Sequence, residues 1–399
     1  MKIAFLSTYV PWPLDTGTRI RSYRMLHFLA DRAEVHLILV GAASASDSAW
    51  TDQVKLASMR VFDIGRIWAN RSDFLRAMAM QQLSFRPCRY HPGLRRQIAS
   101  LLDGLAPQVL IANGTTSAQF LDLDRKLPGV RYLFDDAGTD HLRTARLLDA
   151  ESRVRNRVGG RWDLWRLRRY ERYISSRADG MLAAVPSEAA YLRRWRNNVT
   201  LVPCGANLDL FEFHRSEANN RILLFCGDLT YGPNEDAVAY FLEEIFPRIV
   251  ARHPEAGFVA VGRYREGRLP SLAARFPQVQ LVGYVEDMNP YWRQASIFVN
   301  PMRQGRGFIT KILDALTAGL AVVSTEFLTG DLGIVPGRHF LGAADIEAFV
   351  AAVCALLESP ERKRELAMEG RRFAEEHSWE AALQPLEQVV FAAQERGGR

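Results

Sequence analysis

Residues 300–325 combine basic side chains with glycines ahead of an expected helix. These residues are Arg303, Gly305, Arg306, Gly307 and Lys311. Free N–H groups at a helix N-terminus favour an anion, and glycine lets the backbone approach that anion closely. Basic side chains add charge-assisted hydrogen bonds to phosphate. The segment is therefore suited to bind a phosphate group, and an ordinary strand–helix unit with solvated surface charges is the alternative.

The helix of this segment, which we expect to begin within residues 308–310, also carries a carboxylate. Asp314 follows Lys311 by three residues, so both side chains lie on one face of the helix. A carboxylate at that place can accept hydrogen bonds from the paired hydroxyls of a ribose. With the phosphate-binding features it indicates a pocket for a sugar diphosphate. A surface ion pair between the two side chains is the alternative.

Strands and helices alternate along the chain, which predicts an α/β protein whose parallel sheets are covered by helices on both faces. One series opens with a strand over residues 2–8, a turn that contains Gly17, and a helix over 18–32. A second series starts with a strand over 222–226. A chain of 399 residues has room for two doubly wound domains, and we expect the linker near residues 207–220.

The composition narrows the function classes. With 48% hydrophobic and 24% charged residues the chain is globular, and no apolar run is long enough to span a bilayer. Four cysteines are widely separated: Cys88, Cys204, Cys226 and Cys354. Their spacing fits neither a metal site nor a redox pair, so we expect a cytoplasmic protein with reduced thiols.

Positive charge is concentrated in two windows. Residues 60–96 hold eight arginines against two acids, and residues 141–177 hold eleven against four. Such regions attract anionic lipid, nucleic acid or phosphorylated substrates, unless they are merely solvated helix faces. No nucleic-acid-binding motif is present, so we expect no nucleic-acid partner and keep an anionic membrane surface as a candidate partner.

Four aromatic residues recur at roughly helical spacing in the second window: Trp162, Trp165, Tyr170 and Tyr173. We expect them to pack in the core of the N-terminal domain. A role at a membrane interface is the alternative.

Six segments follow one another along the chain: PWPLDTGTRIR, VPCGANLDLF, GDLTYGPNEDAVAYF, VGYVEDMNPYWRQASIFVNP, RQGRGFITKILDALTAGLAVVST and HSWEAAL. In this order they resemble the retaining glycosyltransferases of family four, which have the glycosyltransferase-B fold. The resemblance implies two facing Rossmann-like domains with a cleft between them. It implies an acceptor domain over residues 1–206, a nucleotide-sugar domain over 207–378, and a last helix over 379–399 that crosses back. It implies no cofactor, because the nucleotide-diphosphate sugar is a substrate, and no metal, because the protein's own cations would stabilise the diphosphate.

The family's Glu-x7-Glu motif aligns with this chain in only one of its two carboxylates. Asp314 matches the second Glu, which the resemblance assigns to the nucleotide ribose. The first Glu is replaced by Arg306, a departure shared by a subgroup with the pattern Pro-x-Arg-x-Gly-x-Gly and a later Lys. The resemblance then leaves backbone N–H groups of Gly307, Phe308 and Ile309 for the donor sugar.

The resemblance assigns the remaining site residues as follows. Family members carry Arg and Lys where this chain has Asp228 and Asn234. We therefore expect the diphosphate charge to be met by Arg263, Arg303, Arg306 and Lys311, and the diphosphate to contact the Gly17 loop. Tyr284 is expected to pack against the nucleobase. A family His near the reacting sugar is replaced by Asp135 or Asp136; we choose Asp136 as the catalytic residue, with a turn-capping role as its alternative.

Together these patterns predict an enzyme. We expect a retaining, metal-independent glycosyltransferase that moves a sugar from a nucleotide-diphosphate sugar to a glycan, lipid-linked or small-molecule acceptor. Exopolysaccharide or surface-glycan synthesis at the cytoplasmic face of the membrane is the expected pathway. A natural-product glycosyltransferase, a nucleotide-sugar epimerase and a non-catalytic nucleotide-sugar-binding partner are the alternatives.

Overall fold

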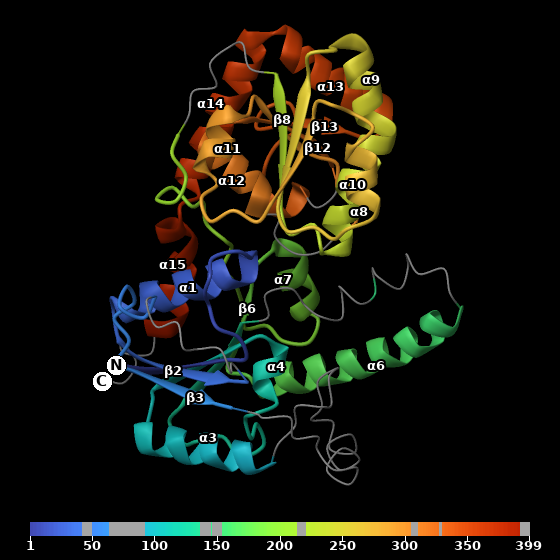
Figure 1. Cartoon of the computed structure of the whole chain (residues 1–399). Helices are drawn as coiled ribbons and strands as arrows, with labels where there is room; N and C mark the ends of the chain where they lie inside the picture. Colours follow the sequence, from blue (N-terminus) through green and yellow to red (C-terminus); the bar gives the residue numbers. More distant parts are fainter. Residues whose placement is uncertain are drawn as a thin grey trace. The chain divides into compact units, whose positions relative to one another are not determined.

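The computed structural model describes residues 1–41, 50–63, 92–135, 145, 154–213, 221–304, 310–326 and 329–391. The chain forms two compact units, one of Met1–Cys204 with Ala382–Arg399 and one of Gly205–Ala381. Each unit contains its own parallel sheet with helices on both faces (Figure 1). The predicted α/β class with two doubly wound domains is therefore confirmed. None of the helices in the described ranges is long and apolar enough to cross a membrane.

Seven parallel strands form the sheet of the first unit, in the order β3-β2-β1-β4-β5-β6-β7. They are β1 (Lys2–Ser7), β2 (Glu34–Val40), β3 (Ser58–Phe62), β4 (Val109–Asn113), β5 (Arg131–Asp135), β6 (Gly180–Ala183) and β7 (Val199–Leu201). The chain runs outward from β1 to β3 and then returns to β4 on the other side of β1. The strand order thus reverses between β1 and β4, and ligands of such sheets bind beyond the carboxyl ends of the strands at this point.

Helices cover both faces of this sheet. They are α1 (Gly17–Ala30), α3 (Pro92–Leu105), α4 (Thr115–Ala118), α6 (Val154–Arg177), α7 (Pro186–Leu192) and α15 (Trp379–Phe391). Ala4 and Leu6 of β1 pack in one core cluster with Leu94 and Ile98 of α3. Helices α1 and α15 lie side by side on the opposite face (Figure 1), joined by an ion pair between Arg32 and Glu387.

Helix α6 has two notable features. It continues through Gly159 and Gly160, although adjacent glycines disfavour a helix. A helical glycine costs only about 1 kcal/mol, and packing along the rest of the helix outweighs this cost. Tyr170 is buried as expected, but Trp162 and Trp165 are 57% and 48% exposed, so the prediction of core packing is wrong for both tryptophans.

Six parallel strands form the sheet of the second unit, in the order β10-β9-β8-β11-β12-β13. They are β8 (Ile222–Cys226), β9 (Gly257–Val261), β10 (Val279–Gly283), β11 (Ile297–Asn300), β12 (Ala321–Thr325) and β13 (Leu341–Ala343). Strand order reverses between β8 and β11, the two central strands. The loops after these strands therefore flank the place where a ligand of this unit is expected.

Alternate residues of the central strands pack in two separate hydrophobic cores, one on each face of the sheet. Phe225 of β8 packs in the cluster that includes residues of α8, α9, α10 and α13. Leu224 packs in the cluster of α11, α12 and α14 on the other face. The helical segments are α8 (Gly232–Tyr240), η2 (Phe241–Ile245), α9 (Phe246–Arg252), α10 (Arg268–Ala273), α11 (Asn289–Gln294), α12 (Thr310–Ala318), η3 (Thr329–Leu332), α13 (Ile346–Glu358) and α14 (Pro360–Glu376). Burial on both faces fixes the carboxyl ends of β8 and β11 in place.

Candidate functional site

Lys311 lies at the strand-order reversal of the second sheet. It is the second residue of α12, and its Nζ donates a 2.6 Å hydrogen bond to Oδ1 of Asn234 in α8. The same ammonium lies 4.3 Å from the centre of the Phe225 ring at the end of β8. The hydrogen-bond partner is a neutral amide, so this contact holds the ammonium without neutralising it.

The environment of Lys311 changes its protonation. Burial lowers its pKa to about 8, while Cys226 and Asp314 act in the opposite direction. Burial raises the pKa of the Cys226 thiol to about 12, so this cysteine stays neutral beside the ammonium. An anionic ligand at Lys311 would favour the charged form of the lysine. The arrangement is that of a cation held ready for an anion.

The loop after β8 passes close to this ammonium because it begins with glycine. Gly227 has φ +144°, and a Cβ at this position would lie 2.9 Å from both Lys311 Nζ and Asn234 Nδ2. Asn234 Nδ2 in turn donates to the Asp228 carbonyl oxygen at 2.9 Å. Gly227 thus leaves room for the lysine where a larger residue would not.

Arg263 pairs with an acid in this structure. Its guanidinium donates to Asp228 Oδ2 at 3.0 Å and lies 5.6 Å from the centre of the Tyr284 ring. Burial would raise the pKa of Asp228, but hydrogen bonds from Thr230 and the Arg263 guanidinium lower it below its usual value. Tyr284 is 49% exposed, so its ring is accessible. Arg263 and Tyr284 therefore form one cluster, connected to Lys311 through Asp228 and Asn234.

Arg303 points to the next turn of α8. It donates to Asp236 Oδ1 at 2.8 Å and lies 4.1 Å from the centre of the Tyr240 ring. In this structure its charge is therefore paired with a carboxylate of α8.

Asp314, one turn beyond Lys311, is held by two residues that sequence reasoning did not single out. Asn207 Nδ2 donates to Asp314 Oδ1 at 2.9 Å, and the Trp379 indole N–H donates to Asn207 Oδ1 at 2.8 Å. Asn207 and Trp379, the first residue of α15, both belong to the second unit, as Asp314 does. Their places within the VPCGANLDLF and HSWEAAL segments were the only available signal, since neither is near Asp314 in sequence.

Six of the predicted site residues lie outside the described residues. They are Asp136, Gly305, Arg306, Gly307, Phe308 and Ile309. Of the twelve predicted residues, the structure connects Lys311, Arg263 and Tyr284 in one network. Asp314 lies on α12 with Lys311, and Arg303 lies in the loop after β11, where it contacts α8. Gly17 belongs to the first unit, where it is the first residue of α1 behind the cap Thr16.

In the first unit, Asp135 is engaged in an ion pair. Arg21 of α1 donates to both of its carboxylate oxygens, at 2.8 and 3.1 Å, and to the Val202 carbonyl oxygen at 2.5 Å. Both side chains are at least 98% buried. Asp135, the alternative to Asp136 in the sequence prediction, therefore joins β5 to α1 and to the segment after β7.

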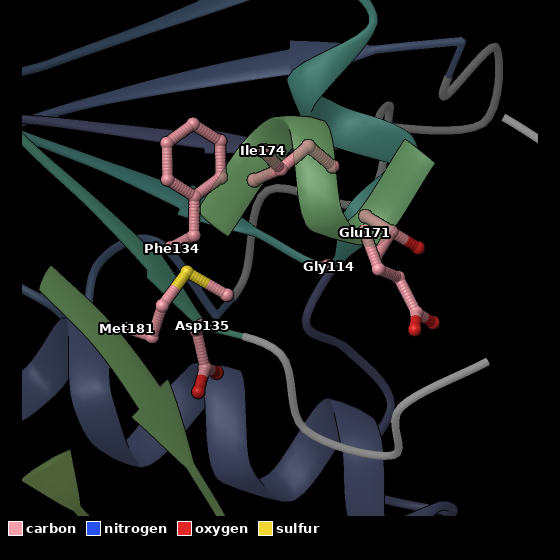
Figure 2. Close-up of a pocket in the computed structure, with 7 residues that line it drawn as sticks. Gly114, Phe134, Asp135, Glu171, Ile174 and Met181 are labelled. Carbon is pink, nitrogen blue, oxygen red and sulfur yellow. The ribbon is translucent and has the colours of Figure 1, made fainter. Parts of the chain in front are cut away.

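A pocket lies beside Asp135, at the carboxyl ends of β4 and β5 and next to Met181 of β6 (Figure 2). Its lining residues are Gly114, Thr115, Phe134, Asp135, Glu171, Ile174 and Met181. In Figure 2 the carboxylates of Asp135 and Glu171 lie apart and do not point toward each other. The Tyr191 hydroxyl donates to Glu171 Oε2 at 3.4 Å. Both acids are thus held by protein groups, and α6 forms one wall of the pocket.

The second unit matches a known family. Residues 220–359 fit the family model described as glycosyl transferases group 1. The match covers less than half of the chain, so the similarity to group 1 glycosyltransferases is shown for this segment alone, and we call it the group 1 domain after the model that it fits. It contains Asn234, Arg263 and Lys311, so the network at the strand-order reversal lies inside the group 1 domain. A protein of Klebsiella pneumoniae described as "Uncharacterized 44.6 kDa protein in cps region" is 22% identical over 174 residues. That match covers 42% of this chain and 45%, less than half, of the relative.

Solved structures resemble the whole chain, not only the group 1 domain. Sucrose-phosphate synthase of Thermosynechococcus elongatus has a TM-score of 0.71 at 19% identity, covering 98% of this chain and 99% of that one. HepE of Anabaena, in complex with UDP and glucose, has a TM-score of 0.66 at 13% identity, with coverage of 98% and 100%. WaaG, a glycosyltransferase involved in lipopolysaccharide biosynthesis, has a TM-score of 0.65 at 13% identity, with coverage of 98% and 99%. The chain has the glycosyltransferase-B fold, as predicted.

The geometry of the group 1 domain favours binding of an anion. A lysine ammonium with a neutral hydrogen-bond partner lies beside a glycine loop, at the carboxyl ends of two central strands. Within the described ranges, no group of three or more His, Cys, Asp or Glu side chains could hold a metal ion.

Proposed function

We propose that this protein is a retaining glycosyltransferase that uses a nucleotide-diphosphate sugar as its donor. The observation that carries the proposal is the position of Lys311 in a group 1 domain, beside Gly227 and Asn234 at the strand-order reversal. HepE, a structural neighbour, is described in complex with UDP and glucose. A diphosphate at Lys311 would receive a charge-assisted hydrogen bond in a partly desolvated site.

The nucleoside is assigned to the two sides of this phosphate position. Asp314, held by Asn207, would accept hydrogen bonds from the ribose hydroxyls. Tyr284, whose ring is half exposed, would pack against the base. Arg263 lies between the Tyr284 ring and Asp228, so it could turn from its acid partner to the phosphates when the donor binds.

In the proposed mechanism the protein stabilises the leaving diphosphate as its bond to the sugar breaks. Lys311, Arg263 and Arg303, with Arg306, would supply the positive charge, and backbone N–H groups of Gly305, Gly307, Phe308 and Ile309 would contact the donor. The leaving phosphate would then help to deprotonate the acceptor hydroxyl on the same face of the sugar, which retains the anomeric configuration. Gly17 would contact the diphosphate and Asp136 would act near the reacting sugar. The mechanism uses the protein's own cations and neither a metal nor a cofactor.

We propose a glycan, lipid-linked or small-molecule acceptor in the synthesis of a surface polysaccharide. The description of the Klebsiella relative as a protein in a cps region supports this pathway, as does the role of WaaG in lipopolysaccharide biosynthesis.

A non-catalytic nucleotide-sugar-binding protein is the second candidate. It is favoured by the ion pairs of Arg263 with Asp228 and of Arg303 with Asp236, because each reduces the positive charge offered to a diphosphate. Such a protein would bind the donor without transferring its sugar to any acceptor.

A thermal-shift screen tests the proposal. UDP, GDP, ADP, TDP and their common sugars would each be added to the full-length protein, since a ligand of the folded state raises the melting temperature by mass action. We expect nucleotides of one base to raise the melting temperature clearly. The nucleotide sugar with that base should be consumed when a suitable acceptor is added. No shift with any nucleotide would contradict the proposal, and a shift without turnover on a broad acceptor panel would favour the second candidate.

A further inference from the structure

One surface of the first unit carries arginine and tryptophan side chains together. We call it the α6 patch. Its members are Arg161, Trp162, Trp165, Arg168, Arg169 and Arg172 of α6 with Arg193, Arg194 and Trp195 after α7. All nine side chains are exposed.

Helical geometry explains why the six α6 residues form a continuous stripe. At 100° per residue, residues 161, 165, 168 and 172 fall along one side of the helix, with 162 and 169 beside them. The opposite side holds Tyr170 and Ile174, which pack in the core of the first unit. By sequence α6 has eight arginines and two acids, and Glu171, one of these acids, is only 1% exposed. One side of α6 therefore packs in the core, and its solvent-exposed side carries both arginines and tryptophans.

The tail of α7 extends the same surface. The Arg172 guanidinium lies 5.0 Å from the centre of the Trp195 ring, and Arg196 donates to the Ser175 carbonyl oxygen at 3.1 Å. These contacts hold the segment after α7 against the C-terminal half of α6. The α6 patch is thus built from two elements that are fixed to each other.

The tryptophans of the α6 patch remain exposed although their rings are organised. Trp162 and Trp165 stack with centroids 5.1 Å apart and an interplanar angle of 25°. Trp195 is 38% exposed. Large apolar side chains that gather on a surface commonly mark an interaction site. Indole rings with nearby arginines are the side-chain set that prefers the interface between water and a bilayer.

We propose that the α6 patch docks the protein on an anionic phospholipid bilayer. The arginines would bind lipid phosphates, and the indoles would enter the headgroup region. Neither the arginines nor the indoles alone would bind the protein firmly to a bilayer, but their contributions to the binding free energy add together. This surface lies within the first unit, so the proposal does not depend on the transferase activity assigned above.

The ring geometry favours lipid over nucleic acid. A base stacks on an uncovered aromatic face. Here Trp162 and Trp165 each cover one face of the other, and the Arg169 guanidinium lies 4.8 Å from the centre of the Trp165 ring, so fewer ring faces are open to a base. The Trp195 ring is likewise covered by Arg172. Insertion into a headgroup layer needs only exposed indole surface, which these rings retain.

Vesicle sedimentation tests the proposal with the full-length protein. The vesicles would be pure phosphatidylcholine or phosphatidylcholine with roughly 30% phosphatidylglycerol, an anionic content that attracts basic surfaces. We expect sedimentation with the anionic vesicles only, and release at high salt, which screens exposed charges. Brominated lipids should also quench the fluorescence of Trp162 and Trp165.

Two sets of substitutions locate the surface. Arg168→Gln/Arg169→Gln/Arg172→Gln should weaken partitioning on the order of tenfold or more, since each arginine contributes to attraction by anionic lipid. Trp162→Ser/Trp165→Ser should weaken partitioning roughly fivefold or more and remove the part of the lipid quenching that comes from these two indoles. Trp162→Phe/Trp165→Phe should restore most of the partitioning.

The matched control makes the same charge change in the second unit. Arg275→Gln/Arg362→Gln/Arg364→Gln alters three exposed arginines outside the α6 patch and should leave partitioning unchanged. Equal effects of the two triple variants, equal binding to neutral and anionic vesicles, or no vesicle binding would overturn the proposal. It would also be overturned if single-stranded RNA bound the α6 patch and the vesicles did not. Unchanged melting temperatures would show that the variants fold.

Discussion

The Lys311 ammonium and the Asn234 amide oxygen lie 2.6 Å apart, and this contact joins α12 to α8 across the ends of β8 and β11. An acid at position 234 would neutralise the lysine, whereas the amide orients it and leaves its charge. A diphosphate at this place would add to the existing hydrogen bond and would not have to displace a carboxylate.

Lys311→Met should remove most of the electrostatic stabilisation of the leaving group. We expect kcat/KM for the donor to fall by about 100-fold or more, the size of effect seen when one such donor is removed from a site. Steady-state kinetics with the donor found by thermal shift would measure it. Lys55→Met, a change at an exposed lysine of the first unit, is the matched control. Equal activity of the Lys311→Met variant and the control would refute the assignment.

Donor affinity should decline as the pH rises through about 8. Below that pH Lys311 is charged in the free protein, because its pKa is lowered to about 8. Above it, binding of a diphosphate requires proton uptake by the lysine, so affinity should fall by up to about tenfold per pH unit. Isothermal titration between pH 7 and pH 9.5 would measure this slope. The Lys311→Met variant should show no such slope, and a slope that persists in this variant would point to another group.

Gly227→Ala should damage both stability and donor binding. The new Cβ would meet Lys311 Nζ and Asn234 Nδ2 at 2.9 Å, in a backbone conformation of φ +144° that side-chain-bearing residues rarely adopt. We expect a loss of about 1–3 kcal/mol in the free energy of unfolding. Gly232→Ala is the control, because nothing lies within 4 Å of its Cβ and Gly232 begins α8. Urea denaturation would measure the free energy of unfolding of both variants. Equal free energies of unfolding would contradict the prediction.

Asp314→Asn should show which part of the ligand Asp314 contacts. If Asp314 binds the ribose, the variant should lose about tenfold or more in affinity for the nucleoside diphosphate and little for inorganic pyrophosphate. Lys311→Met should lower the affinity for both the nucleoside diphosphate and pyrophosphate. Competition binding with the two ligands measures these effects. A similar loss of pyrophosphate affinity in Asp314→Asn would indicate a general disturbance of α12 and not a ribose contact.

Arg21→Met should destabilise the first unit, because Asp135 would remain buried without its bidentate partner. The expected cost is about 3–5 kcal/mol in the free energy of unfolding. The double variant Arg21→Met/Asp135→Leu removes both charges and should be more stable than Arg21→Met alone. Denaturant titration of the two variants would measure the difference. A double variant less stable than the single one would show that Asp135 does not depend on Arg21.

Local sequence patterns determined the elements of this protein. Alternating apolar runs and helical segments predict parallel sheets because each strand must be covered on both faces, and the two sheets have this form. The spacing of Lys311 and Asp314 predicts one shared helix face for the same kind of reason, since three residues span nearly one turn.

Tertiary structure alone decided which distant side chains meet. Arg21 and Asp135 are 114 residues apart, and Asn207 and Trp379 are 172 apart. Such pairs depend on strand order and on how helices dock, and no local periodicity encodes either. The outward position of Trp162 and Trp165 has a similar cause. Aromatic residues occur on both sides of α6, so the sequence pattern alone left open which side is buried. Packing of Tyr170 and Ile174 in the core buried their side and left the two tryptophans outside.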